Sequence, residues 1–173
     1  FILLEKGMMM QPEMVRNIDA RSWGGELTSR YQITDPWLVS AAIAIVRGTN
    51  TTDDSYLPQQ PADELRLASD YRLGEFTYSV LWRLVKQQNR VAPNQGNVIG
   101  YDLEKSAGFG VVSANIDWEV DPKWQLSLGI DNILDKNYAE HLSRSAASIS
   151  GYQQIDKVNE PGRTIWLQTS YQF

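Results

Sequence analysis

The chain has 173 residues, of which 42% are hydrophobic and 10% aromatic, and its formal net charge is -5. This length suits one domain, and an acidic balance without a basic cluster argues against nucleic-acid binding. Cysteine is absent, which excludes a disulfide framework and a thiol nucleophile. No apolar run approaches the ~18 residues of a membrane-spanning helix, but a membrane-spanning strand needs only ~9 to 11.

The front of the chain, FILLEK, supplies a short strand-like stretch before the segment GMMMQPEM. Such a stretch is too short to cross a hydrocarbon layer that requires ~9 to 11 residues of strand. An open sheet edge is not tolerated in lipid, so a closed barrel would need a full first strand. We therefore expect the chain to be truncated at its front, and its eight strand-like stretches to be a lower bound on the strand count.

The later strand-like stretches alternate apolar and polar residues over about nine positions, beyond the ~5 to 6 of an ordinary strand. They are WLVSAAIAI, ELRLASDYR, TYSVLWRLV, VVSANIDWEV, WQLSLGID and TIWLQTSYQF. A period of two predicts strands with one apolar face and one polar face. In a membrane barrel the apolar face contacts lipid, and a watery lumen accepts charges on the other. The predicted lumen charges are Glu64, Arg66, Asp70, Arg83 and Asp117.

Short and long connections alternate along the chain. The short ones, TDPW, RLGE and DPKW, use Asp-Pro and Gly to reverse direction. Long polar segments separate them, and this alternation is typical of outer-membrane barrels whose short turns are periplasmic. Aromatic residues flank the short-turn side and predict an interfacial girdle. The girdle residues are Tyr31, Trp37, Tyr71, Phe76, Trp118 and Trp124, with Tyr171 and Phe173 in the last strand.

These patterns predict an all-β fold, a transmembrane antiparallel β-barrel. A soluble β-sandwich also alternates, but strand length and the gathering of aromatics at one edge favour the barrel. A small eight-stranded barrel with a structural or adhesive role remains an alternative. Catalysis is not expected, because the sole histidine, His141, has no Ser and Asp placed around it by spacing.

Two motifs, LGIDNILDKNYAEH and NEPGRTIWLQTSYQF, resemble the end of TonB-dependent outer-membrane receptors. In that family the penultimate strand reads apolar-x-apolar-G-x-x-N-apolar-x-D-x-x-Y, and the last runs from P-G-R by alternation to a terminal Phe. The resemblance implies that residues 1–173 form the C-terminal portion of a barrel of about 22 strands. It also implies that the last strand carries the signal for the barrel-assembly machinery, through Ile165, Leu167, Tyr171 and Phe173.

What the resemblance implies about function is import across the bacterial outer membrane, amid its lipid and lipopolysaccharide. A plug domain and an energy-coupling segment would precede Phe1, and that segment would engage the TonB-ExbB-ExbD system. No cofactor is expected.

A finer resemblance, to the copper-receptor branch, rests on NYAEHLSRS, ISGY, EPGRTIWL and PQQPADELRL, although PADE stands where Pro-Leu precedes Glu in that branch. It implies copper as the transported ligand; siderophore, haem and cobalamin receptors share the coarse pattern. Thioethers suit Cu(I), with imidazole a compatible partner, so candidate copper-guiding residues are Met8, Met9, Met10, Met14 and His141. Alternatively the methionines fill packing gaps and the histidine is solvated.

Overall fold

The computed structural model describes residues 1–7, 14–97, 100–102, 104–142 and 158–173, and every regular element among them is a β-strand. No helix in these residues is long and apolar enough to cross a membrane. The strands are β1 (Ile2–Glu5), β2 (Met14–Asn17), β3 (Ala20–Thr34), β4 (Trp37–Asn50), β5 (Ser55–Tyr56), β6 (Glu64–Leu73), β7 (Phe76–Val85), β8 (Gln95–Asn97), β9 (Gly100–Tyr101), β10 (Phe109–Asp121), β11 (Trp124–Asp131) and β12 (Thr164–Tyr171).

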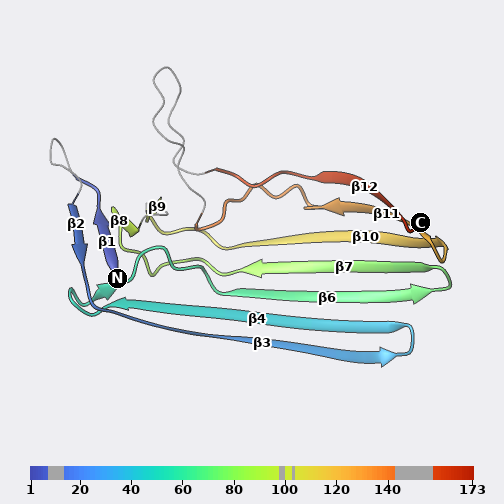
Figure 1. Ribbon diagram of the computed structural model, residues 1–173, viewed down its shortest axis with the longest axis horizontal. Helices are drawn as coiled ribbons and strands as arrows, with labels where there is room; N and C mark the ends of the chain where they lie inside the picture. The colour runs from blue at the N-terminus through green and yellow to red at the C-terminus, as the bar shows by residue number, and fades with distance from the viewer. Residues whose placement is uncertain (8–13, 98–99, 103, 143–157) are drawn as a thin grey trace, which may run out of the picture.

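The long strands form one large antiparallel sheet. Its strand order is β12-β11-β10-β7-β6-β4-β3, with the short β5 paired to β4. The sheet is open, because the path ends at β3 and β12. Figure 1 shows the hairpin turns at one end, with the long connections and the N-terminus at the other. The predicted turns at 34–37, 72–75 and 121–124 are therefore confirmed, and the chain reverses there within a few residues.

A second, four-stranded sheet of order β2-β1-β8-β9 lies at the loop end (Figure 1). It contains the short N-terminal stretch that the sequence predicts cannot span a membrane, now seen as β1 paired with β2 and β8. The large sheet counts eight strands by including β5, and its seven other strands run for eight to fifteen residues.

The apolar face of the sheet points outward. In β7, four apolar residues on one face are 37 to 45% exposed, whereas Thr77, Ser79 and Arg83 on the other face are half-buried. These exposed residues are Phe76, Tyr78, Val80 and Trp82. A soluble sandwich would show the reverse, because its apolar face would be buried against a second sheet. The curved sheet is thus apolar outside and polar inside, as a barrel wall in lipid requires.

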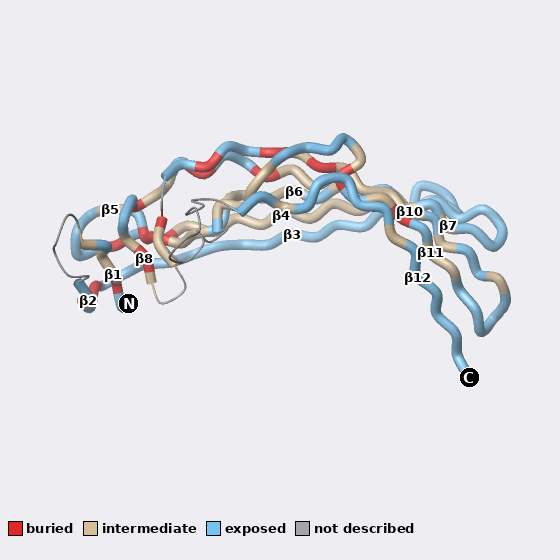
Figure 2. Tube along the Cα trace, turned by 90° about the horizontal axis from the view of Figure 1, so that it is seen from above, coloured by how far each residue is buried: buried red, intermediate tan, exposed pale blue. Residues whose placement is uncertain are grey.

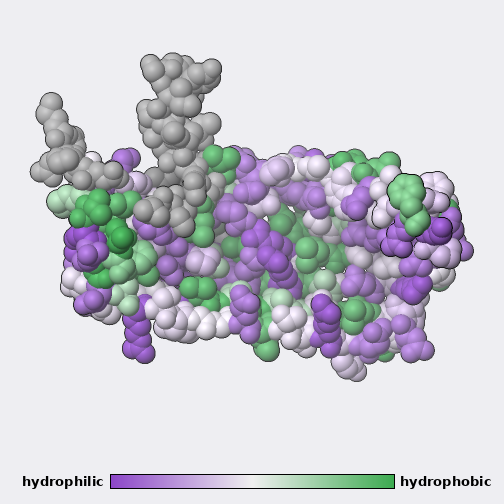
Figure 3. All heavy atoms as spheres, viewed as in Figure 1, coloured by the Kyte–Doolittle hydropathy of each residue, from purple (hydrophilic) through white to green (hydrophobic). Residues whose placement is uncertain are grey.

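Burial is concentrated toward the loop end, while the hairpin turns and the edge strands β3 and β12 are almost entirely exposed (Figure 2). One buried cluster joins Leu3 of β1 with Ile18 and Leu57. Another joins Val85, Phe109 and Val111, with Ala62 and Tyr138 packed against it. On the face shown in Figure 3, hydrophilic side chains gather over the middle strands.

Candidate functional site

The two C-terminal motifs interlock. Asn132, which follows β11 and adopts a φ of 49°, is buried and donates through Nδ2 to the Lys136 carbonyl at 2.8 Å and the Pro161 carbonyl at 3.3 Å. Asp135, at a φ of 52°, accepts the Arg163 backbone N–H through Oδ1 at 2.9 Å. Asn and Asp tolerate such left-handed conformations better than most residues. The Asn and Asp of the first motif therefore bind the Pro-Gly-Arg turn of the second.

A close contact on the inner face completes this lock. Gly129 of β11 stands opposite Trp166 of β12 in the strand register. A Cβ at Gly129 would lie 2.1 Å from Cζ2 of the indole, so the ring rests directly on the glycine backbone. The Gly of the penultimate strand is thus explained by steric demand, since only a residue without a side chain lets the tryptophan lie flat here.

The predicted lumen charges Glu64 and Arg83 form an ion-pair network on the inner face. The Arg83 guanidinium donates to both Glu64 oxygens, at 2.9 and 2.7 Å, and also pairs with Glu140. Arg66 pairs with Glu64, and Arg83 lies 5.4 Å above the Phe109 ring. The Glu64 and Arg83 side chains are only 17 and 22% exposed. Charges this sheltered are retained where each is paired.

The other two predicted lumen charges lie nearer the hairpin turns. Asp117 accepts hydrogen bonds from Ser127 Oγ at 2.5 Å and from Asn115 Nδ2 at 2.7 Å. Asp70 is half-buried and stands opposite Ser79 in register. All five residues therefore lie on the polar face, and their proposed contact with a plug domain remains a prediction.

The aromatic residues predicted as a girdle gather near the hairpin turns. Trp37 pairs in register with Tyr71, and Phe76 stacks on Trp118 with ring centroids 5.7 Å apart. The ring nitrogens keep polar partners: that of Trp37 donates to Ser69 Oγ at 2.9 Å, and that of Trp124 donates to Thr169 Oγ1 at 2.9 Å. Tyr31 in β3 is 68% exposed. Rings with an apolar body and a bonded polar tip suit the membrane boundary.

In the last strand, the predicted assembly residues all lie on the exposed outer face. Ile165 is 71% exposed, Leu167 74% and Tyr171 54%, and the ring of Phe173 packs edge-on against Tyr171 at 5.3 Å. Among the described strands, β12 pairs with β11 alone. Its role in assembly remains a prediction.

The long connections are fastened by a buried carboxylate, Asp102. Its oxygens accept the backbone N–H groups of Gln59 and Ala92, both at 2.9 Å, and the Gln59 side chain at 3.0 Å. The side chain of His141 is 5% exposed; its Nε2 lies 3.7 Å from Asp102 and its Nδ1 lies 3.1 Å from Ser106 Oγ. The alternative that this histidine is solvated is therefore wrong, because its ring is buried between two of the long connections.

The methionines contribute little to the described structure. Met8, Met9 and Met10 lie outside the described residues, and Met14, in the edge strand β2, is 57% exposed. The side chain of His141, by contrast, is buried beside Asp102 and Ser106. Within the described ranges no three His, Cys, Asp or Glu side chains are grouped as metal ligands. The copper-guiding role of these residues remains a prediction.

Sequence reasoning missed several residues that organise the loop end. Arg47 holds Asp63 by a pair of contacts, one of them at 2.9 Å, and this guanidinium keeps the pKa of Asp63 below its ordinary value of 3.8. Gln88 is fully buried and donates to the carbonyls of Pro61 and Gln60. These residues show no local signal, since their partners are distant in sequence. Glu140 could have been found from its place in the NYAEH motif.

Comparisons with known proteins agree with this architecture. The family model described as TonB dependent receptor-like, beta-barrel matches residues 11–133. The solved structure of the copper transporter OprC is 43% identical, with a TM-score of 0.93 over 100% of this chain and 28% of that one. No curated protein sequence matches the chain.

Two more distant structures share the fold alone. The ferric yersiniabactin receptor FyuA from Yersinia pestis is 15% identical, with a TM-score of 0.66 over 89% of this chain and 24% of that one. The ferric citrate transporter FecA is 19% identical, with a TM-score of 0.68 over 98% of this chain and 26% of that one. The chain thus spans about a quarter of these receptors and transporters. It forms part of an outer-membrane β-barrel and belongs to the TonB-dependent receptor family.

Proposed function

We propose that the whole protein imports copper across the outer membrane. The observation that carries the proposal is the 43% identity to the copper transporter OprC over 100% of this chain. The iron receptors are 15 to 19% identical and so bear on the fold alone. The fold by itself does not choose a substrate, because ligands are recognised by loops and plug.

In this mechanism the described strands act as a rigid wall. The Glu64–Arg83 network faces the lumen, where it would contact a plug domain. The TonB-ExbB-ExbD system would move that plug and let the metal pass, and the barrel-assembly machinery would recognise β12. Lipopolysaccharide would surround the outer loops. No resident cofactor is needed, since copper is the cargo.

Within this fragment, the methionine-rich segment that includes Met8, Met9, Met10 and Met14 would attract Cu(I) through soft thioether sulfurs. His141 is buried beside Asp102, so it would reach a metal only if the two connections separated. These residues would therefore guide or concentrate copper, while its tight site would draw on parts of the protein outside residues 1–173.

The test is a Cu(I) titration of the full-length receptor in detergent under reducing conditions, beside a variant with all four methionines changed to Ser. Stoichiometric binding kept by the variant supports the copper proposal with a tight site elsewhere, and weakened binding places ligands in the methionine segment. Absence of binding in both proteins refutes copper as cargo and returns the substrate to the siderophore, haem or cobalamin class.

A cellular experiment tests the import step. Copper accumulation in a receptor-deleted strain should be restored by the full-length gene only when TonB is present. Equal accumulation with and without TonB would contradict energy-coupled import.

A further inference from the structure

Four basic residues come together where the long strands reach the loop end. Arg21 is the second residue of β3, Arg47 is near the end of β4, and Lys86 and Arg90 follow β7. We call these four residues the outer basic cluster. The chain as a whole carries a net charge of -5, so a gathering of cations is a distinct feature of this part of the surface.

Strand periodicity places the cluster on the outer face of the wall. Side chains alternate between the two faces of a sheet, so residues four positions apart share a face. Arg47 comes four positions after the exposed Ile43 of β4, and Lys86 comes four positions after the exposed Trp82 of β7. Arg21 is a diagonal neighbour of Arg47 in the register of β3 with β4. The cations therefore continue the apolar outer face beyond its last apolar residues.

The carboxylate of Asp63 holds part of the cluster together. Arg47 donates to both of its oxygens, in one contact at 2.9 Å, and Nη2 of Arg90 lies 3.5 Å from Oδ1. The backbone N–H of Lys86 donates to the Asp63 carbonyl at 2.9 Å. The hydrogen bonds from Arg47 lower the pKa of Asp63, and the charges of Arg90 and Lys86 act in the same direction. Four cations around this one carboxylate leave an excess of three positive charges within the cluster.

The cluster lies at the height where the outer leaflet meets water. Arg47 is ten positions along β4 from Trp37, which stands beside a hairpin turn. At ~3.3 Å per residue and a strand tilt of ~40°, this length rises about 25 Å across the membrane, the height of the apolar band of an outer-membrane barrel. Trp23 is opposite Arg47 in the register and is 57% exposed, as expected for an aromatic residue at the interface. Phosphate groups of outer-leaflet lipids lie at this level.

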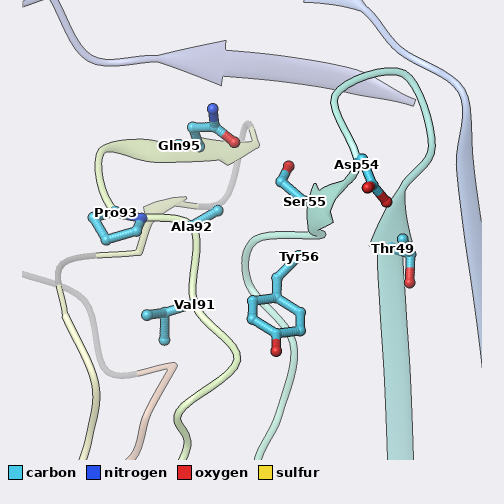
Figure 4. Close-up of a pocket in the computed structure, with 8 residues that line it drawn as sticks. All are labelled: Thr49, Asp54, Ser55, Tyr56, Val91, Ala92, Pro93 and Gln95. Atoms are coloured by element: carbon cyan, nitrogen blue, oxygen red, sulfur yellow. The ribbon is translucent and has the colours of Figure 1, made fainter.

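Space is open next to the cluster, on the side away from the hairpin turns. The lining of a hollow of about 630 Å³ includes Val91, one position after Arg90, and Thr49, two positions after Arg47. Figure 4 shows Val91 and Thr49 on opposite sides of this hollow. A headgroup larger than a phosphate can therefore approach the two arginines without displacing a packed element.

The chemistry around the cluster selects an anionic amphiphile. Within the described part of the chain, Arg47 uses three of its five N–H groups on Asp63 and the Val46 carbonyl. The other two can donate to an anion, and the planar guanidinium matches the geometry of phosphate. Toward the membrane, the same outer face carries exposed apolar side chains, which include Leu27, Ile43 and Trp82. A ligand with phosphate at one end and acyl chains at the other fits both surfaces.

We propose that the outer basic cluster binds the phosphate of an outer-leaflet lipid. The phosphate oxygens would accept hydrogen bonds from Arg47 and Arg90 and pair with the charges of Arg21 and Lys86, while the acyl chains lie along the apolar face. Lipopolysaccharide, the phosphorylated glycolipid of that leaflet, has this chemistry. The inference rests on the outer-membrane location and not on copper import, so its test does not depend on the cargo.

The experiment uses the full-length receptor, freed of bound lipid in a non-ionic detergent. Binding of diphosphoryl lipid A, the lipid anchor of lipopolysaccharide, is titrated by native mass spectrometry, with dephosphorylated lipid A and inorganic phosphate as comparison probes. The site variant combines Arg21→Gln with Lys86→Gln, because both side chains are exposed and Arg47 then still pairs with Asp63. The matched control combines Lys105→Gln with Lys136→Gln, two exposed lysines at the loop end outside the cluster.

Each charge removed from the cluster should weaken binding of diphosphoryl lipid A about five-fold, the effect of one basic residue near an anionic lipid surface. The site variant should therefore bind about 25-fold more weakly, while the control binds like the unaltered protein. The proposal is overturned if the site and control variants bind equally, or if dephosphorylated lipid A binds as tightly as the diphosphoryl form. Inorganic phosphate that binds as tightly as lipid A would also overturn it, since the ligand would then be a soluble anion.

Heat-modified gel mobility establishes that each variant is a folded barrel. If the double site variant fails this check, Lys86→Gln alone decides the question, with an expected loss of about five-fold.

Discussion

Replacement of Gly129 by Ala tests whether the contact with Trp166 holds the last two strands together. The added Cβ would lie 2.1 and 2.2 Å from two carbons of the indole, where ordinary contact begins at 3.4 Å. Because the Trp166 indole is rigid, the whole ring must move by more than about 1 Å, and its packing contact with β11 is then lost. Overpacking of this kind costs about 1 to 3 kcal/mol.

The assay is urea unfolding of the full-length receptor in detergent, followed by tryptophan fluorescence and by heat-modified gel mobility. Gly25→Ala is the matched control, because a Cβ at Gly25 meets nothing within 4 Å. This control should be neutral or slightly stabilising, since Ala loses less backbone entropy than Gly. A double variant that also carries Trp166→Leu should recover part of the loss, because the smaller side chain leaves room for the methyl group. Equal stability of Gly129→Ala and Gly25→Ala would refute the steric argument.

Three more predictions concern polar groups. Arg83→Met should lower the unfolding free energy by about 2 kcal/mol or more, since it removes the ion-pair partner of Glu140 and leaves the sheltered Glu64 with Arg66 alone; unchanged urea unfolding would show that the network contributes nothing. Because Arg47 lowers the pKa of Asp63, the ion pair stabilises the fold fully above about pH 4, and this stabilisation is lost as the pH falls through the pKa of the folded state. Amide protection of the loops, measured by hydrogen exchange, should therefore be weaker at pH 3 than at pH 7 in the unaltered protein. In Asp63→Asn this change in protection with pH should be absent. Asp102→Leu should expose the connections it fastens, so limited proteolysis should cut near residues 59 and 92 faster than in the unaltered protein, and equal cleavage would contradict its anchoring role.

The wall could be predicted from the sequence because strand geometry is local. Alternation in TYSVLWRLV assigns Trp82 and Arg83 to opposite faces whatever their neighbours are, and Asp-Pro and Gly mark the turns. The two C-terminal motifs likewise indicated the family, but they did not explain why a glycine stands at position 129.

The loop end could not be predicted, since its contacts join residues far apart in the chain. Asp102 binds Gln59 across 43 positions, and Gln95 reaches Glu5 across 90. No period or short motif encodes such pairs. The stretch FILLEK shows the same limit: its length excluded a spanning strand, but its partner β8 lies beyond the second hairpin of the large sheet.

Asn132 and Asp135 bind the Pro161–Arg163 turn, so the connection between β11 and β12 can change without changing the strands themselves. Both ends of the intervening segment are already tied together at its base, so lengthening the segment adds loop-closure entropy of only about 0.6 kcal/mol per doubling. Insertions between the two ends of this segment would leave the pairing of β11 with β12 unchanged. The connection between β11 and β12 can therefore change in length and sequence while the register of the two strands is kept.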